Sequence, residues 1–145
     1  MIVNFKKLYD DAITPTRGSE YAAGYDLYAY ISSKIDIPPH TTVKIDTGIA
    51  IECPEGYFGA IFARSGLATK QGLRPANAVG VIDADYRGMV IVALHNDTDD
   101  YQTIVPDERI AQLVFIPYLD ITFNEVDDLS ETERGSGGFG STGTK

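Results

Sequence analysis

The chain has 145 residues, a length that fits one domain with a sizeable core and requires no second domain. Its formal net charge of −9 disfavours binding to nucleic acid or to an acidic membrane surface. No apolar run approaches about 18 residues and no charged-then-apolar leader follows Met1, so we expect a cytoplasmic protein, or a host-cell cytoplasmic one if the gene is viral. The single cysteine, Cys53, cannot form an internal disulfide.

Short segments with the periodicity of β-strands follow one another along the first half of the chain. They cover residues 2–9, 23–30, 35–37, 41–52 and 57–63. The last of these is almost continuously apolar, which is typical of a strand covered on both faces. Asp26 interrupts the second segment and needs a partner there. That partner is either a hydrogen-bonding loop or the water shell of a metal ion.

A sharp polar segment, Arg64 to Gly72, follows these strands. Ser65 can cap a short helix over residues 67–71, with Gly72 ending it, and this is the only helix that we expect. Backbone N–H groups and Arg64 would then converge on an anion. The competing interpretation is that Ser65 is only a cap and Arg64 only a surface charge.

The central stretch, residues 77–88, places two carboxylates, an aromatic ring and a cation between two apolar runs. It predicts a hairpin followed by a buried strand over residues 89–94. Asp83 would lie at the end of a strand, partly desolvated between Ile82 and Ala84, which makes it a candidate general base. The competing interpretation is an ordinary polar turn.

Three further strands are expected over residues 101–105, 109–116 and 121–126. Gln112 lies within the second of them and needs hydrogen-bond partners, which are either backbone or ligand oxygens. The segment Asn96-Asp97-Thr98 fits a glycosylation acceptor pattern, which we discount because nothing suggests a secreted chain.

Five glycines occur between residues 135 and 143, which leaves this segment too little apolar surface to fold alone. It is either a mobile tail or a ligand-binding one. For binding, Phe139 suits stacking on a ring, and Arg134, Ser141 and Thr142 suit phosphate oxygens. The segment is not a Walker A loop, because the required Gly-Lys-Ser/Thr sequence is missing.

Taken together and in order, five of these segments resemble the motifs of the trimeric deoxyuridine triphosphatases (dUTPases). They are residues 23–29, 63–68, 80–88, 108–113 and 134–143. The resemblance runs from about residue 5 to the C-terminus. One departure is Asp107, where the family usually has glycine, and this puts the shape of that turn in question.

The resemblance implies an all-β fold, a compact antiparallel jelly-roll-like β barrel over residues 1–133, with one short helix. Residues 134–145 would be a flexible glycine-rich tail that closes an active site. Three chains would form a homotrimer and share three sites. The implied reaction converts dUTP to dUMP and pyrophosphate with Mg²⁺, which removes dUTP from the nucleotide pool and supplies the dTMP precursor.

The resemblance also implies roles for individual residues. Asp83 would activate the water that attacks the α-phosphorus, and Asp26 would contact the water shell of the metal. Phe139 would stack on uracil, and Tyr86 would lie against the deoxyribose and exclude a 2′-hydroxyl. The implied substrate-binding residues are Arg64, Ser65, Gly66, Asn77, Gly80, Ile82, Tyr86, Gln112, Arg134, Phe139, Gly140, Ser141 and Thr142.

Two other functions compete with this one. A dCTP deaminase shares the fold, but its chemistry commonly uses a glutamate at the base, and residues 77–88 contain none. The second competing function is that of a regulatory protein, which binds the nucleotide and acts through protein partners. An intact Asp83 argues against a purely non-catalytic role.

Overall fold

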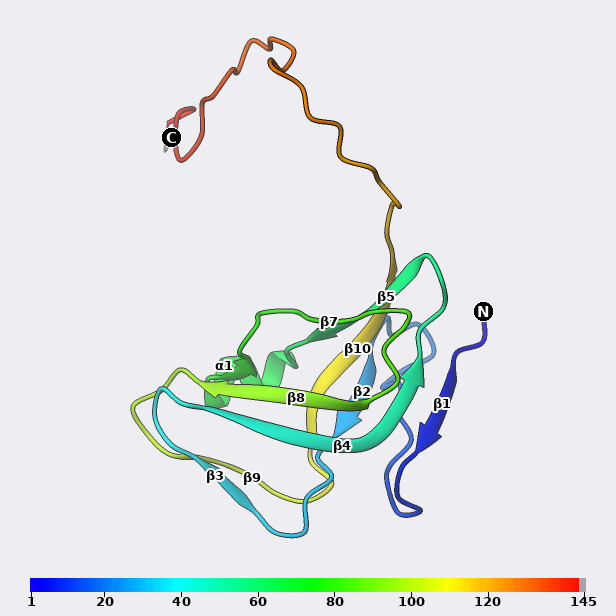
Figure 1. The fold of residues 1–145 in the computed structure, drawn as a ribbon. Coiled ribbons are helices and arrows are strands. Elements are labelled where there is room, and N and C mark those ends of the chain that lie inside the picture. Colours follow the sequence, from blue (N-terminus) through cyan, green and yellow to red (C-terminus); the bar gives the residue numbers. More distant parts are fainter. Residues whose placement is uncertain (144–145) are drawn as a thin grey trace.

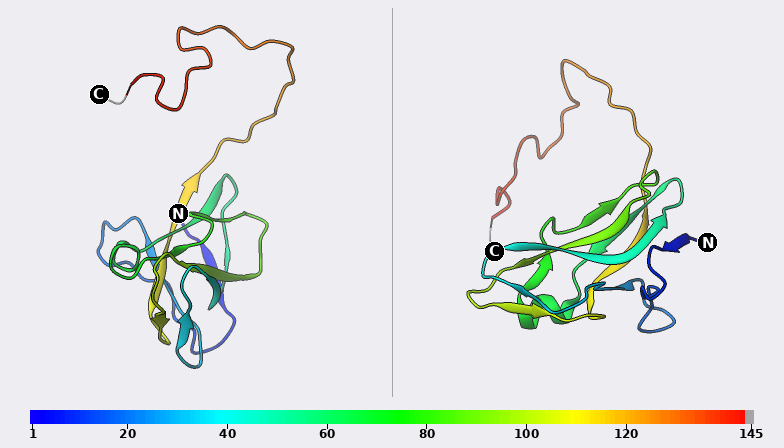
Figure 2. Two further views of the ribbon diagram at one scale, coloured as in Figure 1. Left: turned by 90° about the vertical axis from the view of Figure 1, so that its left-hand side faces the viewer. Right: turned by 60° about the horizontal axis from the view of Figure 1, so that its bottom comes forward.

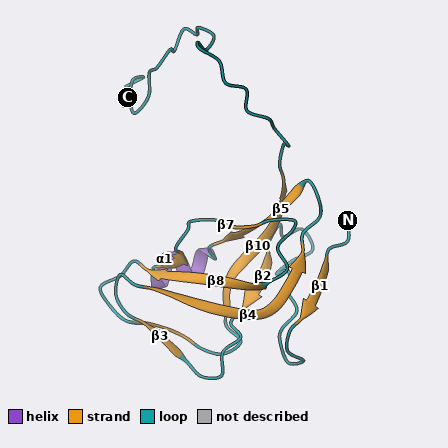
Figure 3. Cartoon of the chain, in the orientation of Figure 1, coloured by secondary structure: helices purple, strands orange, loops and turns teal. Residues whose placement is uncertain are grey.

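A computed structural model describes residues 1–143 and confirms the expected antiparallel all-β architecture (Figure 1). The strands are β1 (Asn4–Lys7), β2 (Tyr25–Tyr28), β3 (Ile35–Ile37), β4 (Thr42–Glu52), β5 (Tyr57–Phe62), β6 (Leu73–Pro75), β7 (Gly80–Ile82), β8 (Met89–Asn96), β9 (Gln102–Ile104) and β10 (Arg109–Pro117). Within residues 1–143 there is one helix, α1 (Ser65–Gln71), coloured purple in Figure 3.

The strands form two four-stranded sheets of jelly-roll type and one small ribbon. One sheet has the order β1-β4-β8-β6, the other has the order β2-β10-β5-β7, and β3 pairs with β9. All of these pairs are antiparallel. The hydrogen-bonded strand order leaves each sheet with edges, so the expected barrel is open rather than closed.

The core lies between the two sheets, where the alternating apolar residues predicted from the sequence point inward. Its fully buried side chains include Leu27, Ile45, Leu94, Ile104 and Ile110. Strand β8 contributes only every second residue, and Ile91 is 41% exposed. The strand predicted over residues 89–94 is therefore confirmed, but its burial is limited to one face, because the other face of β8 is open in the single chain.

The hairpin expected in the central stretch, residues 77–88, is not formed, because this stretch contains only one strand, β7. Strand β7 pairs with β5, whereas β8 pairs with β4 and β6, so β7 and β8 belong to different sheets. The connection between them, residues 83–88, crosses from one sheet to the other. This crossing loop carries Asp83 and Tyr86.

Helix α1 begins one residue earlier than Ser65 capping would require. Its N-cap is Arg64, which makes no side-chain capping hydrogen bond, and Ser65 is the first helical residue. The expectation that Ser65 caps the helix is therefore wrong. Gly72 ends the helix in the left-handed conformation, with φ at 63°, as expected for glycine at this position.

Residues 121–126 form no strand, contrary to the expectation from their alternation. Figures 1 and 2 show that the chain leaves the sheets after β10, and in Figure 1 the segment that follows extends away from them. Ile121 and Phe123 are 62% and 92% exposed. The division between residues 1–133 and the tail 134–145 remains a hypothesis, and residues 144–145 lie outside the described residues.

Asn96 is fully buried and holds three segments together. Its Nδ2 donates to the carbonyl oxygens of Ile37, at 3.0 Å, and of Asp100, at 2.7 Å. Its Oδ1 accepts from the backbone N–H of Thr98 at 2.9 Å. A side chain so enclosed is not available to a glycosylating enzyme in the folded protein.

Among the described residues, no helix has both the length and the apolar character needed to cross a membrane.

Candidate active site

A cavity of about 190 Å³ gathers most of the residues predicted to read the base and the sugar. Five candidate residues line it together, namely Asn77, Gly80, Ile82, Asp83 and Tyr86. Its wall is completed by Ile61 of β5 and by the start of β8. The structure therefore shows that these five residues, which are near one another in the sequence, also line one cavity.

Pairing of β7 with β5 shapes this cavity. Gly80 lies opposite Ile61 in the β5–β7 pair. A β-carbon at position 80 would approach the Ile61 β-carbon to 3.1 Å, which is closer than β-carbons normally pack. Glycine therefore permits the close approach of the two strands. Next to Asn77, Ala78 adopts a positive φ of 60°.

The Tyr86 side chain is held by a hydrogen bond at the end of the crossing loop, where β8 begins. Its hydroxyl donates to the carbonyl oxygen of Met89 at 2.9 Å. A β-carbon at position 88 would overlap the Tyr86 hydroxyl, so Gly88 provides the space that the ring occupies. The 43% exposed ring therefore has a defined position beside the cavity.

Asp83 is exposed in the single chain, so the expected partial desolvation is not observed. Its carbonyl oxygen accepts from the backbone N–H of Tyr86 at 3.2 Å, which closes a turn after β7. Buried Cys53 lies nearby. Burial, and to a lesser extent the negative charge of Asp83, raises the pKa of the Cys53 thiol above its ordinary value.

A second cluster forms around Asp26 on β2, the edge strand of this sheet opposite to β7. Arg64 Nε donates to Asp26 Oδ1 at 2.9 Å, and Arg109 Nη1 lies 3.5 Å from Asp26 Oδ2. The Asp26 side chain is only 14% exposed, so the two arginines compensate a largely buried carboxylate. No role was predicted for Arg109 from the sequence, although its position within the segment 108–113 was a signal.

Gln112 belongs to the same cluster because its register on β10 places it opposite Asp26. Its Nε2 donates to the carbonyl oxygen of Ala63 at 2.9 Å, at the end of β5. A β-carbon at position 24 would overlap the Gln112 amide oxygen, so Gly24 provides the space for that amide. Of the partners considered for Gln112, the backbone is therefore the one present in the single chain.

Ser65 and Gly66 lie in the first turn of α1, directly after Arg64, and both are exposed. The first-turn N–H groups of a helix have no partner within the helix, so they are available to an acceptor. The Asp26 cluster thus combines two cations, amide groups and one carboxylate, contributed by Asp26, Arg64, Ser65, Gly66, Arg109 and Gln112. This composition suits phosphate oxygens.

The turn at Asp107 keeps a shape that favours glycine. Asp107 has a positive φ of 64°, and its N–H donates to the carbonyl oxygen of Ala29 at 3.0 Å. Aspartate is one of the few residues with a side chain that adopts this conformation. The departure from the family pattern therefore leaves the turn before β10 formed.

Asp83 lies at the end of the cavity that is farther from the Asp26 cluster, whereas Gly80 pairs with Ile61, next to the last residue of β5. Ile82 pairs with Gly59 near the start of that strand, whereas Arg64 follows its last residue, Phe62. Five residues along an extended chain correspond to about 17 Å. Asp83, next to Ile82, is therefore not brought together with Arg64 within one chain.

The tail residues are not brought to either cluster. Arg134 Nε donates to the carbonyl oxygen of Gly137 at 2.8 Å, and Ser141 N–H donates to that of Gly138 at 3.0 Å. Every hydrogen bond described for residues 134–143 has its partner within 132–143. Phe139 is fully exposed, and Gly140 and Thr142 are exposed as well.

The carboxylate of Asp26 suits contact with a hydrated metal ion better than direct coordination of the ion. Within residues 1–143 no group of three or more His, Cys, Asp or Glu side chains converges as metal ligands. An ionised carboxylate has about four lone-pair sites, and the two arginines occupy two of them. Capacity for a metal-bound water therefore remains at Asp26, which fits magnesium because this ion keeps several waters.

Comparison with known proteins agrees with the motif resemblance. A family model described as dUTPase matches residues 10–143. Deoxyuridine 5′-triphosphate nucleotidohydrolase of Desulfitobacterium hafniense is 50% identical over 130 residues, which cover 89% of this chain and 86% of that protein. The protein of the same name from Escherichia phage T5 is 43% identical over 150 residues, covering 99% and 100%.

The fold is likewise similar to solved structures. A dUTPase variant of Staphylococcus bacteriophage 80alpha, described with dUpNHpp, superimposes with a TM-score of 0.87. The two sequences are 29% identical, and the match covers 99% of each chain.

Proposed function

The chain belongs to the dUTPase family, and we propose that it hydrolyses dUTP to dUMP and pyrophosphate with Asp83 as the general base. The Asp83 carboxylate takes a proton from a water molecule, whose oxygen bonds to the α-phosphorus. The bond from the α-phosphorus to the oxygen that bridges to the β-phosphorus breaks, and its electron pair leaves with pyrophosphate. General-base assistance of this kind contributes about 10²–10⁴-fold.

The observation that carries this proposal is the shared cavity of Asn77, Asp83 and Tyr86. Uracil would lie between Asn77 and the backbone around Gly80 and Ile82, where a narrow space rejects the methyl group of thymine. A cytosine amino group would face a donor instead of an acceptor. Tyr86, held over Gly88, would occupy the space of a 2′-hydroxyl and so select deoxyribose.

The triphosphate would be held by the Asp26 cluster. Arg64, Arg109 and Gln112 would donate to phosphate oxygens, with Ser65 and Gly66 adding donors at the start of α1. Asp26 orients Arg64 and would accept a hydrogen bond from a water bound to magnesium. When bound to the triphosphate, magnesium would neutralise charge on the phosphates and on the departing pyrophosphate.

We propose that the protein is a homotrimer whose sites are shared between chains. A separation of about 17 Å along β5 between the position opposite Ile82 and Arg64 supports this, because the general base Asp83 and the phosphate-binding cations must act on the same nucleotide. Exposed Ile121 and Phe123 alternate as in a strand that lacks its partner. The exposed face of β8 is a further surface that a second chain could cover.

The tail would complete the site after nucleotide has bound. Arg134, Ser141 and Thr142 would bind the terminal phosphate, Gly140 would bring its N–H group close to the nucleotide, and Phe139 would stack on uracil. The full exposure of Phe139 in the single chain supports its stacking role, because an exposed ring is available to a ligand. Ordering of such a segment over a site excludes water from the reaction.

Hydrolysis is favoured over both competing functions, because the family match includes the segments that carry Asp83 and the tail motif. We place the reaction in the cytoplasm, or in that of the host if the gene is viral, and a phage protein among the relatives supports the second possibility.

The test is the variant Asp83→Asn, which keeps the shape of the side chain and removes its basicity. We expect dUpNHpp binding at the wild-type affinity and a turnover rate lower by at least about 100-fold. Near-normal turnover would remove Asp83 from its role. Ammonia release from dCTP by the wild-type protein would instead support a deaminase.

A further inference from the structure

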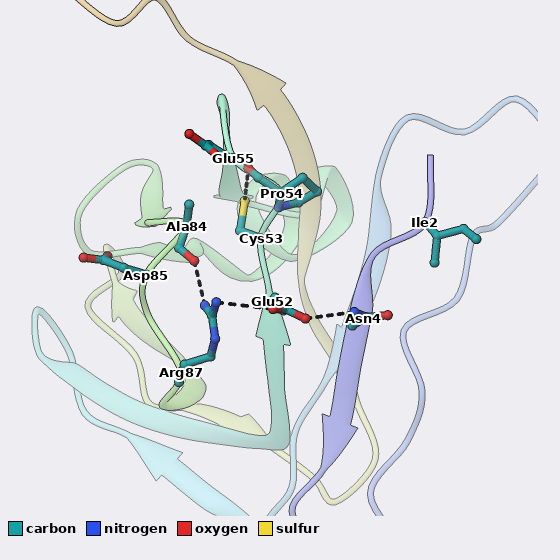
Figure 4. A pocket seen from close by; sticks show the side chains of 9 residues that line it. All are labelled: Ile2, Asn4, Glu52, Cys53, Pro54, Glu55, Ala84, Asp85 and Arg87. Atoms are coloured by element: carbon teal, nitrogen blue, oxygen red, sulfur yellow. Dashed lines mark hydrogen bonds and ion pairs between the residues drawn. The ribbon is translucent and has the colours of Figure 1, made fainter.

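The crossing loop between β7 and β8 separates two cavities. Asp83 and Tyr86 line the cavity assigned to the base and the sugar, whereas Ala84 and Arg87 line a second one of about 470 Å³. Figure 4 shows this second cavity, with Arg87 pointing from the loop toward Glu52 at the end of β4. The proposed reaction uses none of these side chains.

Arg87 bonds to the loop that carries it. Its Nη1 donates to the carbonyl oxygen of Ala84 at 2.6 Å and to the carbonyl oxygen of the preceding residue, Tyr86, at 3.1 Å. Hydrogen bonds from a charged donor are about twice as strong as neutral ones. The only backbone hydrogen bond described within residues 83–88 joins Tyr86 to Asp83, so the guanidinium supplies most of the polar contacts that shape this loop.

The same guanidinium is tied to the sheet that lies behind the loop. Arg87 Nη2 is 3.4 Å from Glu52 Oε1, and the second carboxylate oxygen of Glu52 accepts from Asn4 Nδ2 at 2.8 Å. Asn4 and Glu52 are also opposite each other in the β1–β4 pair. Figure 4 shows the chain of contacts from Asn4 through Glu52 to Arg87 and Ala84.

We propose that Arg87, oriented by Glu52, is a positioning residue that holds the crossing loop so that Asp83 and Tyr86 face the nucleotide. This inference rests on the proposed roles of Asp83 and Tyr86. The loop joins two different sheets and has no ladder of its own, so its shape depends on side-chain contacts. Misplacement of a reacting group by about 1 Å can lower a rate about 100-fold.

A simple surface ion pair would behave differently. Arg87 and Glu52 are 56% and 51% exposed, and pairs this exposed contribute little to stability. Removing Arg87 should therefore change the melting temperature little while it changes catalysis. Arg74 offers a matched control, because it bonds to the carboxylate of Asp97 at 2.7 and 3.0 Å and to the Pro75 carbonyl at 3.2 Å, away from the crossing loop.

The experiment compares Arg87→Met, Arg87→Lys and Glu52→Ala, the double variant Glu52→Ala/Arg87→Met, and the control Arg74→Met. For each we would measure kcat and KM for dUTP, the preference for dUTP over UTP, dUpNHpp binding and the melting temperature. We expect Arg87→Met to lower kcat about 10-fold and to reduce the preference for dUTP, with binding within about 2-fold of wild type. Arg87→Lys should recover part of the loss, because an ammonium group can still reach one carbonyl.

Glu52→Ala should have a smaller effect, and the double variant should be no worse than Arg87→Met, because Glu52 acts through Arg87. Wild-type kcat and selectivity in Arg87→Met would overturn the inference, as would an equal loss in Arg74→Met. A wild-type protein that releases no pyrophosphate from dUTP would contradict the proposed function itself. Normal wild-type turnover with an unchanged Arg87→Met would contradict only the positioning role.

Discussion

Gly24 lies so close to Gln112 that any side chain at position 24 would overlap the Gln112 amide oxygen. Gly24 directly precedes β2, whose pairing with β10 places Gln112 opposite Asp26, and Gln112 Nε2 donates to the Ala63 carbonyl at 2.9 Å. The amide therefore has little freedom to move away. A phosphate-binding side chain thus depends on a residue that has no side chain at all.

Replacing Gly24 should therefore impair catalysis through Gln112. In Gly24→Ala the new methyl group displaces the amide from the Asp26 cluster, and we expect kcat/KM for dUTP to fall about 10- to 100-fold. Gly18→Ala is the matched control, because nothing lies within 4 Å of a β-carbon at position 18. Equal activity of the two variants would show that the Gln112 amide does not need its present position.

Shared sites can be tested by mixing two inactive chains. Asp83→Asn lacks the base, and Arg64→Gln lacks a phosphate-binding cation while an amide still faces Asp26. If each site takes Asp83 from one chain and Arg64 from another, co-expression of both variants should restore roughly a quarter of wild-type activity in a cyclic trimer. Activity no higher than that of the separate variants would mean that one chain holds a complete site.

The tail should matter for activity and not for stability. Its described hydrogen bonds are internal, so ending the chain before Arg134 should leave the melting temperature unchanged. Loss of the groups proposed to bind the terminal phosphate and the base should lower kcat/KM at least about 100-fold. Thermal unfolding and pyrophosphate release would check both expectations. Normal hydrolysis by the shortened chain would show that the tail takes no part.

The turn before β10 carries a correctable strain. Asp107 has a φ of 64°, a conformation that costs residues with side chains about 1–2 kcal/mol, and aspartate less than most. We expect Asp107→Gly to raise the free energy of unfolding by about 1 kcal/mol, measured by urea denaturation. Asp107→Ala keeps the β-carbon and should give no gain. A less stable glycine variant would mean that the Asp107 side chain itself stabilises the turn.

Local patterns predicted most elements of this fold. The alternation around Leu27 and Ile45 and the apolar run at β5 placed three strands, and Gly72 placed the end of the helix, because these features depend on neighbouring residues. The short strand β6 was not anticipated, since Pro75 at its end argues against a strand.

The errors concern partners that are distant in sequence. A hairpin was predicted in residues 77–88, but β7 pairs with β5, and only the assembled sheets reveal this. The alternation at Ile121 and Phe123 indicates a strand, yet the single chain offers no strand beside it. For the site, the motifs predicted the cavity residues around Asp83, whereas the contact of Arg109 with Asp26 became visible only in three dimensions.

The most direct measurement of the central claim is pyrophosphate release by the purified protein with magnesium, comparing dUTP with dTTP, dCTP and UTP. Release from dUTP alone is the predicted result, because it requires the reaction, the reading of uracil and the exclusion of a 2′-hydroxyl together. A folded protein that releases no pyrophosphate from dUTP would contradict the account.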